Sequence, residues 1–307
     1  MMREQMLPAA RSDAAGWPWH DDTRARIPIT TVNSIPWPQI SIVTPSFNQG
    51  PFLEETIRSV LLQGYPNLEY IIIDGGSTDN SVEIIRKYEP WLTYWVSEKD
   101  RGQAHAIKRG FERAQGDVLG WLNSDDLILP GALAVVGRAF HKHPGSEVVY
   151  GNRLILNSDG TVVGQQFPPS PILRASWALG QPLGQESTFW RRDAYLAAGG
   201  MDESLFFAMD YDLFYRLFLR GRFRKVRRFL GCIREHEGTK SARSQDIRNE
   251  EFGRVKLRYG IKEPAPTTSW FVTQGCRWLS RRERLMVTVA WRGQAERQPS
   301  SAWNELE

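Results

Sequence analysis

Short apolar runs alternate with amphipathic segments through the first half of this chain of 307 residues. Strand-like runs cover residues 39–44, 68–73, 91–96, 117–122 and 147–150. Segments with apolar residues at helical spacing lie between them, at residues 51–63, 80–88, 104–114 and 130–140. This alternation predicts an α/β fold, with a mostly parallel, Rossmann-like sheet flanked by helices.

The two ends of the chain differ from this central part. Residues 1–37 are rich in Pro, Trp and charge and predict an irregular leader. Residues 38–240 are expected to form the main domain, although the pattern becomes irregular after Gly151 and is helical again near residues 210–219. Residues 241–307 are expected to form a basic, aromatic C-terminal helical tail.

Composition limits the class and the compartment of the protein. The hydrophobic fraction of 41% and the charged fraction of 24% are those of an ordinary globular protein. No run of 18 apolar residues indicates a membrane-spanning helix, and the N-terminus lacks the apolar centre of a secretory signal. Because Cys232 and Cys276 have no metal-binding spacing and suggest no disulfide framework, we expect a cytoplasmic location.

Basic residues gather at residues 216–228 and 277–284, within a net charge of +4. Such clusters attract phosphates, although a solvated basic face is an equal interpretation. The arginines and tryptophans of residues 261–307 can lie on the inner face of an anionic membrane or pack on the main domain as a helix. No nucleic-acid-binding motif accompanies the charge, so we expect no nucleic-acid partner.

Ligands of parallel sheets bind at the carboxyl ends of the strands, so the residues after each run indicate function. Thr44, Pro45 and Phe47 can hold a nucleobase by stacking and hydrogen bonding, or Asn48 can simply cap the next helix. Asp74 begins the sequence Asp-Gly-Gly-Ser-Thr-Asp, which can bind a ribose or a base or can be a tight turn.

Charged residues follow the third and fourth runs. Asp100 and Arg101 can face a base and a phosphate, or can belong to an exposed loop. Residues 123–126, with the sequence Asn-Ser-Asp-Asp, place several oxygen-bearing side chains at the end of a buried strand. Because Mg²⁺ takes oxygen ligands, often one or two carboxylates together with substrate phosphates, this segment predicts a divalent-metal site. The alternative is an acidic helix N-terminus.

Asp210 lies at the start of the later helical segment. A carboxylate in this position can act as a general base toward a hydroxyl group. The alternative is a structural role, because acidic residues are favoured in the first turn of a helix.

Taken in order, these motifs resemble the family 2 glycosyltransferases, which have the GT-A fold, over roughly residues 38–240. The resemblance implies inverting transfer of a hexosyl or N-acetylhexosaminyl group from a nucleotide-sugar donor to a hydroxyl group. The acceptor would be a glycan or a lipid-linked molecule, and the metal would be Mn²⁺ or Mg²⁺. Bacterial polysaccharide or lipopolysaccharide biosynthesis is the expectation for the family.

The resemblance also implies individual roles. It assigns the donor side to Thr44, Pro45, Phe47, Asp74, Asp100, Arg101, Asn123 and Ser124, the metal to Asp125 and His236, the acceptor side to Gln185 and Glu186, and catalysis to Asp210. Two positions depart from the family pattern, which has Asp where Asn123 stands and Glu where Met209 stands. These departures leave open a degenerate protein that binds nucleotide or glycan without transfer.

Two other classes of nucleotide-binding enzyme fit the sequence less well. A nucleotidyltransferase needs a Gly-rich, Arg-containing phosphate loop after the first strand, and residues 44–50 contain none. A dinucleotide oxidoreductase is disfavoured because no G-x-G-x-x-G motif follows a strand.

Overall fold

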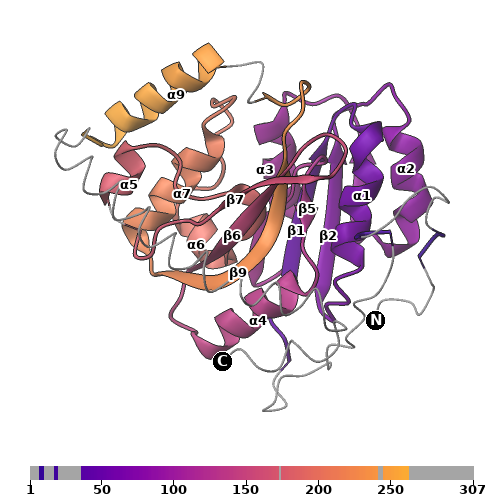
Figure 1. Cartoon of the computed structure of the whole chain (residues 1–307), viewed down its shortest axis with the longest axis horizontal. Helices are drawn as coiled ribbons and strands as arrows, with labels where there is room; N and C mark the ends of the chain where they lie inside the picture. The colour runs from indigo at the N-terminus through magenta and orange to yellow at the C-terminus, as the bar shows by residue number, and fades with distance from the viewer. Residues whose placement is uncertain (1–6, 10–16, 20–35, 173, 241–244, 263–307) are drawn as a thin grey trace.

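The computed structural model describes residues 7–9, 17–19, 36–172, 174–240 and 245–262, in which a nine-stranded sheet is flanked by helices (Figure 1). The strands are β1 (Ile40–Ser46), β2 (Leu68–Asp74), β3 (Tyr94–Ser97), β4 (Val118–Trp121), β5 (Leu127–Ile128), β6 (Val148–Leu156), β7 (Val162–Gln166), β8 (Thr188–Arg191) and β9 (Phe223–Arg234). The helices are α1 (Gly50–Leu61), α2 (Ser81–Tyr88), α3 (Gln103–Arg113), α4 (Ala132–Lys142), α5 (Arg174–Ala178), α6 (Arg192–Ala197), α7 (Met209–Arg220) and α9 (Gln245–Arg258), with 3₁₀ turns η1 (Glu89–Trp91) and η2 (Gln185–Ser187). The predicted α/β architecture is confirmed.

The N-terminal half of the sheet is parallel and has the strand order β3-β2-β1-β4. Its strands match the predicted runs closely, except that β3 begins three residues later than expected. The 3₁₀ turn η1 occupies the preceding residues. Pro90 suits such a turn because its φ angle is restricted and it has no N–H to donate to a ladder.

The second half of the sheet is mixed, and the expectation of irregular structure after Gly151 is wrong. Strand β6 continues to Leu156, β8 lies antiparallel between β4 and β6, and β9 runs parallel to β6. Strand β7 is largely exposed, and basic residues occupy most of the first half of β9. These strands therefore lack the continuous apolar run by which a buried strand is recognised.

Apolar residues fill both faces of the sheet, and each face has its own core. On β1, Val43 packs in a cluster with residues of α3 and α7, whereas Ile42 packs on the opposite face with residues of α1, α2 and α4. Figure 1 shows α1 and α3 on opposite sides of β1. Because successive side chains of a strand point to opposite faces, burial on both faces explains the apolar runs in the sequence.

Parts of the N-terminal leader pack on α1 through the buried side chain of Arg58. Its guanidinium donates hydrogen bonds to the carbonyl oxygens of Pro8, at 2.8 Å, and Pro18, at 3.1 Å, and lies over the ring of Trp19. None of the helices in the described ranges is long and apolar enough to cross a membrane. Cys276 and most of the predicted tail, residues 263–307, lie outside the described residues.

Helix α3 approaches β1 so closely that position 110 has room only for glycine. A methyl group there would lie 2.3 Å from Cγ1 of Val43. We expect Gly110→Ala to lower the free energy of unfolding by up to about 2 kcal/mol, because the cost of overpacking exceeds the gain in helix propensity. Gly253→Ala in α9 meets no atom within 4 Å and should raise it by up to about 1 kcal/mol. Urea unfolding measures both values, and equal changes would contradict the close packing.

Candidate functional site

The loop after β2 is organised by the carboxylate of Asp74, which is fully buried. Its Oδ2 accepts hydrogen bonds from the backbone N–H groups of Gly76 and Ser77, at 3.1 and 2.9 Å, and from Oγ of Ser97, at 2.7 Å. Its Oδ1 accepts from Oγ of Ser77 at 2.6 Å. The geometry therefore favours an indirect role, in which Asp74 shapes the loop, and direct contact with a nucleoside stays a prediction.

Asp100 lies against the backbone of this loop. A Cβ atom on Gly75 would be only 2.9 Å from Oδ2 of Asp100, so the absence of a side chain at Gly75 lets the carboxylate approach. Asp100 thus reaches the end of β2 from another loop.

The β1 residues Thr44 and Pro45 are buried, and Oγ1 of Thr44 is 3.1 Å from the hydroxyl of Tyr70.

Other groups flank the same loop. The side chain of Phe47 is 59% exposed and offers a flat apolar surface. The Ser46 hydroxyl is buried and has no hydrogen-bond partner in the described part of the chain. Asn48 does not cap α1, because its Oδ1 accepts from the backbone N–H of Thr78 at 2.8 Å. Arg101 is exposed and forms an ion pair with Glu203 at 2.6 Å.

A hydrogen-bonded network supports the loop after β4. The carboxylate of Asp126 is 2% exposed and accepts hydrogen bonds from Nδ2 of Asn123, at 3.1 Å, and from Nε2 of Gln185, at 2.6 Å. Oδ1 of Asn123 accepts from Nε2 of Gln103 at 2.7 Å, and Ser124 beside it is buried. Burial, and then the charges of neighbouring carboxylates, raise the pKa of Asp126 well above its ordinary value.

Asp125 points away from this network toward His236, which follows β9. Oδ2 of Asp125 and Nε2 of His236 are 3.1 Å apart, and their side chains are 16% and 11% exposed. The imidazole packs against the ring of Phe52, with 4.6 Å between the centroids. Nε of Arg234 donates a hydrogen bond to the backbone carbonyl of Asp125 at 3.1 Å. Two residues predicted to bind metal are thus in contact.

No third acidic, histidine or cysteine side chain completes a metal cluster around this pair within the residues the structure covers. Nδ1 of His236 accepts the N–H of Gly238 at 3.1 Å, which leaves the proton of a neutral ring on Nε2, facing Asp125. The carboxylate of Asp125 fits a divalent cation as it stands. The neutral imidazole fits as a ligand through Nε2 only in the other tautomer, in which the proton is on Nδ1 and the hydrogen bond from Gly238 is lost.

Asp210 is the second residue of α7, as predicted, and it is partly buried. Burial raises the pKa of its carboxyl group to about 6, although the backbone N–H of Tyr211 and the positive charges of Arg153 and Lys240 oppose the shift. The hydrogen bond from Tyr211 to Oδ1 is 2.7 Å long. A carboxylate with such a pKa accepts a proton more readily than an ordinary aspartate does.

Lys240 and Arg153 are residues of this site that the sequence analysis missed. Nζ of Lys240 donates to Oε1 of Gln103 and to the carbonyl oxygen of Phe206, both at 2.7 Å. Burial lowers the pKa of Lys240 to about 8, while the carboxylates of Asp210 and Glu251 oppose that shift. Lys240 follows His236 by four residues, but nothing in the sequence shows that this lysine lies near Asp210, because only the fold brings the two together.

The residues assigned to the acceptor side, Gln185 and Glu186, lie in the turn η2 and are buried. Oε2 of Glu186 is 3.4 Å from the guanidinium of Arg153, whose Nε donates to Oε1 of Gln166 at 2.6 Å. Oε1 of Glu186 is buried without a hydrogen-bond partner among the described residues. This turn joins the network of Asp126 to the surroundings of Asp210.

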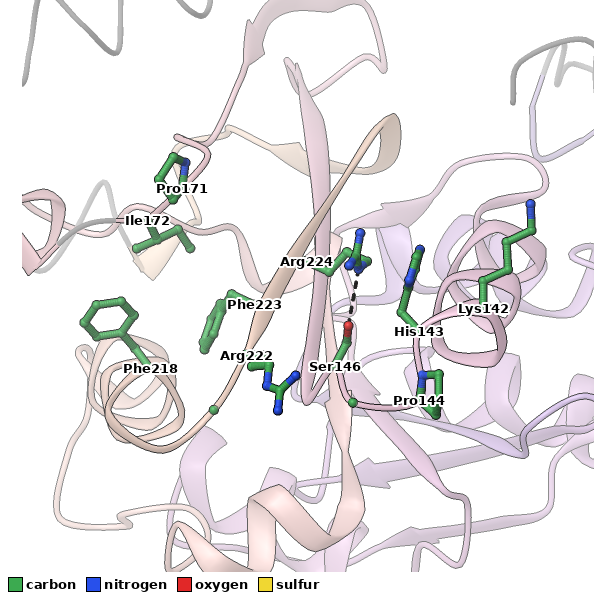
Figure 2. Close-up of a pocket in the computed structure, with 12 residues that line it drawn as sticks. Lys142, His143, Pro144, Ser146, Pro171, Ile172, Phe218, Arg222, Phe223 and Arg224 are labelled. Carbon is green, nitrogen blue, oxygen red and sulfur yellow. Dashed lines mark hydrogen bonds between the residues drawn. The ribbon is translucent and has the colours of Figure 1, made fainter.

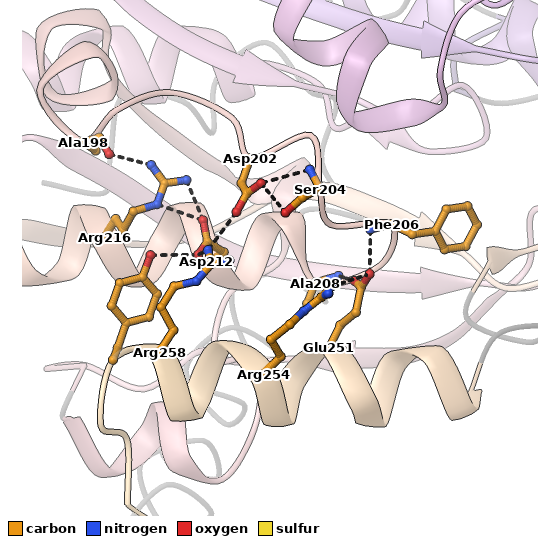
Figure 3. A network of polar contacts seen from close by, with 11 residues as sticks. Ala198, Asp202, Ser204, Phe206, Ala208, Asp212, Arg216, Glu251, Arg254 and Arg258 are labelled. Carbon is orange, nitrogen blue, oxygen red and sulfur yellow. Dashed lines mark hydrogen bonds and ion pairs between the residues drawn. The ribbon is translucent and has the colours of Figure 1, made fainter.

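Helix α9 holds the segment that leads into α7 (Figure 3). The buried carboxylate of Glu251 accepts hydrogen bonds from three consecutive backbone N–H groups, those of Phe206, Phe207 and Ala208, at 2.7–2.9 Å. At the C-terminal end of α9, the guanidinium of Arg258 bonds Asp202 and Asp212. The helix therefore braces both the entry to α7 and the turn that contains Asp210.

Comparison with known proteins identifies a family. The model of the family described as glycosyl transferase family 2 matches residues 41–196, just over half of the chain. An uncharacterized glycosyltransferase of Mycobacterium tuberculosis is 34% identical over 185 residues, which are 58% of this chain and 68% of that protein. Chondroitin synthase of Escherichia coli is 25% identical over 74% of this chain, which spans only 34% of the synthase.

Two solved structures resemble the fold. Staphylococcus aureus TarS 1–349 in complex with UDP has a TM-score of 0.54 and 19% identity, over 65% of this chain and 61% of that one. The mannosyltransferase PcManGT from Pyrobaculum calidifontis, in complex with GDP-Man and Mn²⁺, has a TM-score of 0.55 and 19% identity, over 75% and 66%. These likenesses show the fold, and the predicted GT-A type is confirmed.

The bracing by α9 can be tested with two neighbouring glutamates. Glu251→Ala removes the acceptor for three N–H groups, and we expect it to lower the free energy of unfolding by at least about 2 kcal/mol. Amide hydrogen exchange at Phe206, Phe207 and Ala208 should also become faster. Glu250→Ala, on the exposed side of α9, should change stability by less than about 0.5 kcal/mol. Equal effects of the two substitutions would contradict the bracing.

Proposed function

The chain belongs to glycosyl transferase family 2, and on that premise we propose that it is an inverting transferase. It would move a sugar from a nucleoside diphosphate donor to a hydroxyl group of a growing glycan or a lipid-linked acceptor. The observation that carries the proposal is the partly buried carboxylate of Asp210, with a pKa of about 6, near Lys240 and Arg153. The relatives support a place in bacterial polysaccharide synthesis, and a cytoplasmic location would suit it.

Asp210 is the proposed general base. Its carboxylate takes the proton of the acceptor hydroxyl while the oxygen forms a bond to the anomeric carbon. The bond between that carbon and the phosphate oxygen breaks, and the nucleoside diphosphate leaves with the electron pair. Because attack and departure occur on opposite sides in one displacement, the anomeric configuration inverts.

Lys240 is proposed to face the negative charge of the departing diphosphate. Its ammonium group has three N–H donors, and two of them bond Gln103 and Phe206. The third has no hydrogen-bond partner among the described residues and would face a phosphate oxygen. A positive charge placed where negative charge develops stabilises the transition state, above all where burial excludes water.

Asp125 would hold a divalent cation, with His236 as a second ligand through Nε2 in the tautomer that carries its proton on Nδ1. Mn²⁺ or Mg²⁺ bound there would supply positive charge that neutralises the diphosphate. Asp126 fits this role less well, because it is buried and its carboxylate oxygens already accept hydrogen bonds from Asn123, Gln185 and the backbone of Arg234. Asp126 instead orients the loop that carries Asp125.

The acceptor would lie beside η2 and Arg153. Oε1 of Glu186, which has no partner among the described residues, and the guanidinium of Arg153 offer an acceptor and donors of hydrogen bonds near Asp210. Hydroxyl groups of a sugar match such a mixed set. On the donor side, the exposed ring of Phe47 and the carboxylate of Asp100 would contact the base.

Asp210→Asn tests the base. The amide keeps the shape but cannot accept the proton, so we expect kcat to fall by about 10²–10⁴-fold, with donor binding retained. Release of nucleoside diphosphate in the presence of acceptor measures turnover. The matched control is Asp246→Asn, at an exposed position in α9, which should leave kcat unchanged. Near-normal turnover of the Asp210 variant would show that another group takes the proton.

The raised pKa of Asp210 predicts two pH effects. For the wild type, kcat/KM should rise with pH through about 6, because the base must lose its proton. The pKa of Asp210 in the folded protein lies above its unfolded value of 3.8. The stability that this carboxyl group contributes is therefore present below pH 3.8 and is lost as the pH rises toward 6. Asp210→Asn should therefore raise the free energy of unfolding at pH 7 by up to about 3 kcal/mol, and by less at about pH 4.5. Urea unfolding at the two pH values tests the sign, and a pH-independent difference would contradict it.

A thermal-shift panel of UDP, GDP, dTDP and CDP, each with and without Mn²⁺, tests the donor site. One nucleotide should raise the Tm, and more so with Mn²⁺. We expect Asp125→Ala to keep the shift caused by nucleotide alone and to lose the part that depends on Mn²⁺, whereas Asp159→Ala, in an exposed loop, should behave like the wild type. No shift with any nucleotide would argue against a nucleotide-sugar donor. A strong shift without any sugar transfer would favour the degenerate binding protein.

A further inference from the structure

A hollow of about 590 Å³ lies between the end of α4 and the start of β9, away from the proposed catalytic residue Asp210 (Figure 2). Figure 2 shows Ile172 and the rings of Phe218 and Phe223 at one end, and the basic side chains of His143 and Arg224 at the other. Helix α7 runs from the site to the hollow, and the eight residues between Asp210 and Phe218 correspond to about 12 Å. The hollow is therefore separate from the catalytic residues.

Positive charge extends from this hollow along α4 and β9, which pack together. Arg222 and Arg224 are exposed at the start of β9, and the guanidinium of Arg222 has no hydrogen bond or ion pair within the described ranges. Farther along β9, Arg228 lies near the exposed side chain of Arg138 on α4. The basic residues therefore form one surface, which we call the α4–β9 surface and define as Arg138, Lys142, His143, Arg222, Arg224 and Arg228.

The basic residues of the α4–β9 surface lie close enough together for their charges to act on one another. Partial burial, and then the charges of Arg224 and Lys142, lower the pKa of His143. Burial, and then the charge of Arg138, lower the pKa of Arg228. The carboxylate of Glu147 approaches this surface at Gly221. Like charges held close together raise the free energy of the isolated protein, and a polyanion would relieve this repulsion.

We propose that the α4–β9 surface docks on a membrane containing anionic phospholipids, with a phosphate headgroup in the hollow. The basic side chains match the headgroup phosphates. The apolar side chains at the other end of the hollow match the acyl region next to the headgroup, which a soluble phosphate lacks. This assignment does not depend on the proposed sugar transfer, because none of these residues belongs to the proposed catalytic site.

The test is co-sedimentation of the full chain with two kinds of vesicle, one of phosphatidylcholine alone and one that also contains phosphatidylglycerol. The wild type should bind only the anionic vesicles, and high salt should release it. The double variant Arg222→Gln/Arg224→Gln should lower the partition coefficient roughly 30-fold, since each basic residue near an anionic surface accounts for about a fivefold change. The double variant Arg86→Gln/Lys87→Gln, which removes the same charge from exposed positions on α2, should bind within about twofold of the wild type.

Several outcomes would overturn the assignment. One is equal binding of both double variants, given that their Tm values match that of the wild type. Another is saturable binding of inorganic phosphate, lost in the Arg222→Gln/Arg224→Gln variant, without binding to anionic vesicles, because the hollow would then be a site for soluble phosphate. A third is duplex DNA that binds in place of vesicles and depends on the same arginines, because the surface would then belong to a nucleic-acid partner.

Discussion

Both oxygens of the Asp126 carboxylate accept hydrogen bonds, and the side chain is almost wholly buried. Its donors come from three distant parts of the chain, namely Asn123 after β4, Gln185 in η2 and the backbone of Arg234 at the end of β9. A buried carboxylate without such donors would be strongly destabilising. This one interaction therefore joins the parallel half of the sheet to the mixed half, and it sets the shape of the loop that presents Asp125.

A chain of hydrogen bonds leads from this centre to Lys240, whose positive charge acts on the proposed base. Asn123 bonds Gln103 at the start of α3, and Gln103 accepts from Lys240, which lies near Asp210. The charge of Glu251 in α9 reaches the same lysine, while its carboxylate holds the backbone before α7. The charges of Lys240 and Asp210 act on each other's pKa. A negatively charged nucleotide bound beside Lys240 would therefore also act on the pKa of Asp210.

Local patterns predicted the parallel half of the fold well, because its strands are buried on both faces and leave continuous apolar runs. They also predicted Asp210 in the first turn of a helix and a polar loop at residues 123–126. They failed for the second half of β6 and for β7 to β9, where exposed and basic positions break the apolar pattern and the pairing with β6 shifts in register. They also missed the contact between Gln103 and Lys240, since residues so far apart in sequence share no local signal.

The sequence by itself determined the class of fold, the family and a set of candidate residues for the chemistry, because these depend on local periodicity and on motifs at strand ends. Only the tertiary structure decided how those residues are used. It buries Asp74 and Asp126 as supports, turns Asp125 toward His236, and raises the pKa of Asp210 beside Lys240 and Arg153. The reason is physical. Burial, hydrogen-bond partners and the distances between charges arise when remote segments pack together, and no single segment contains them.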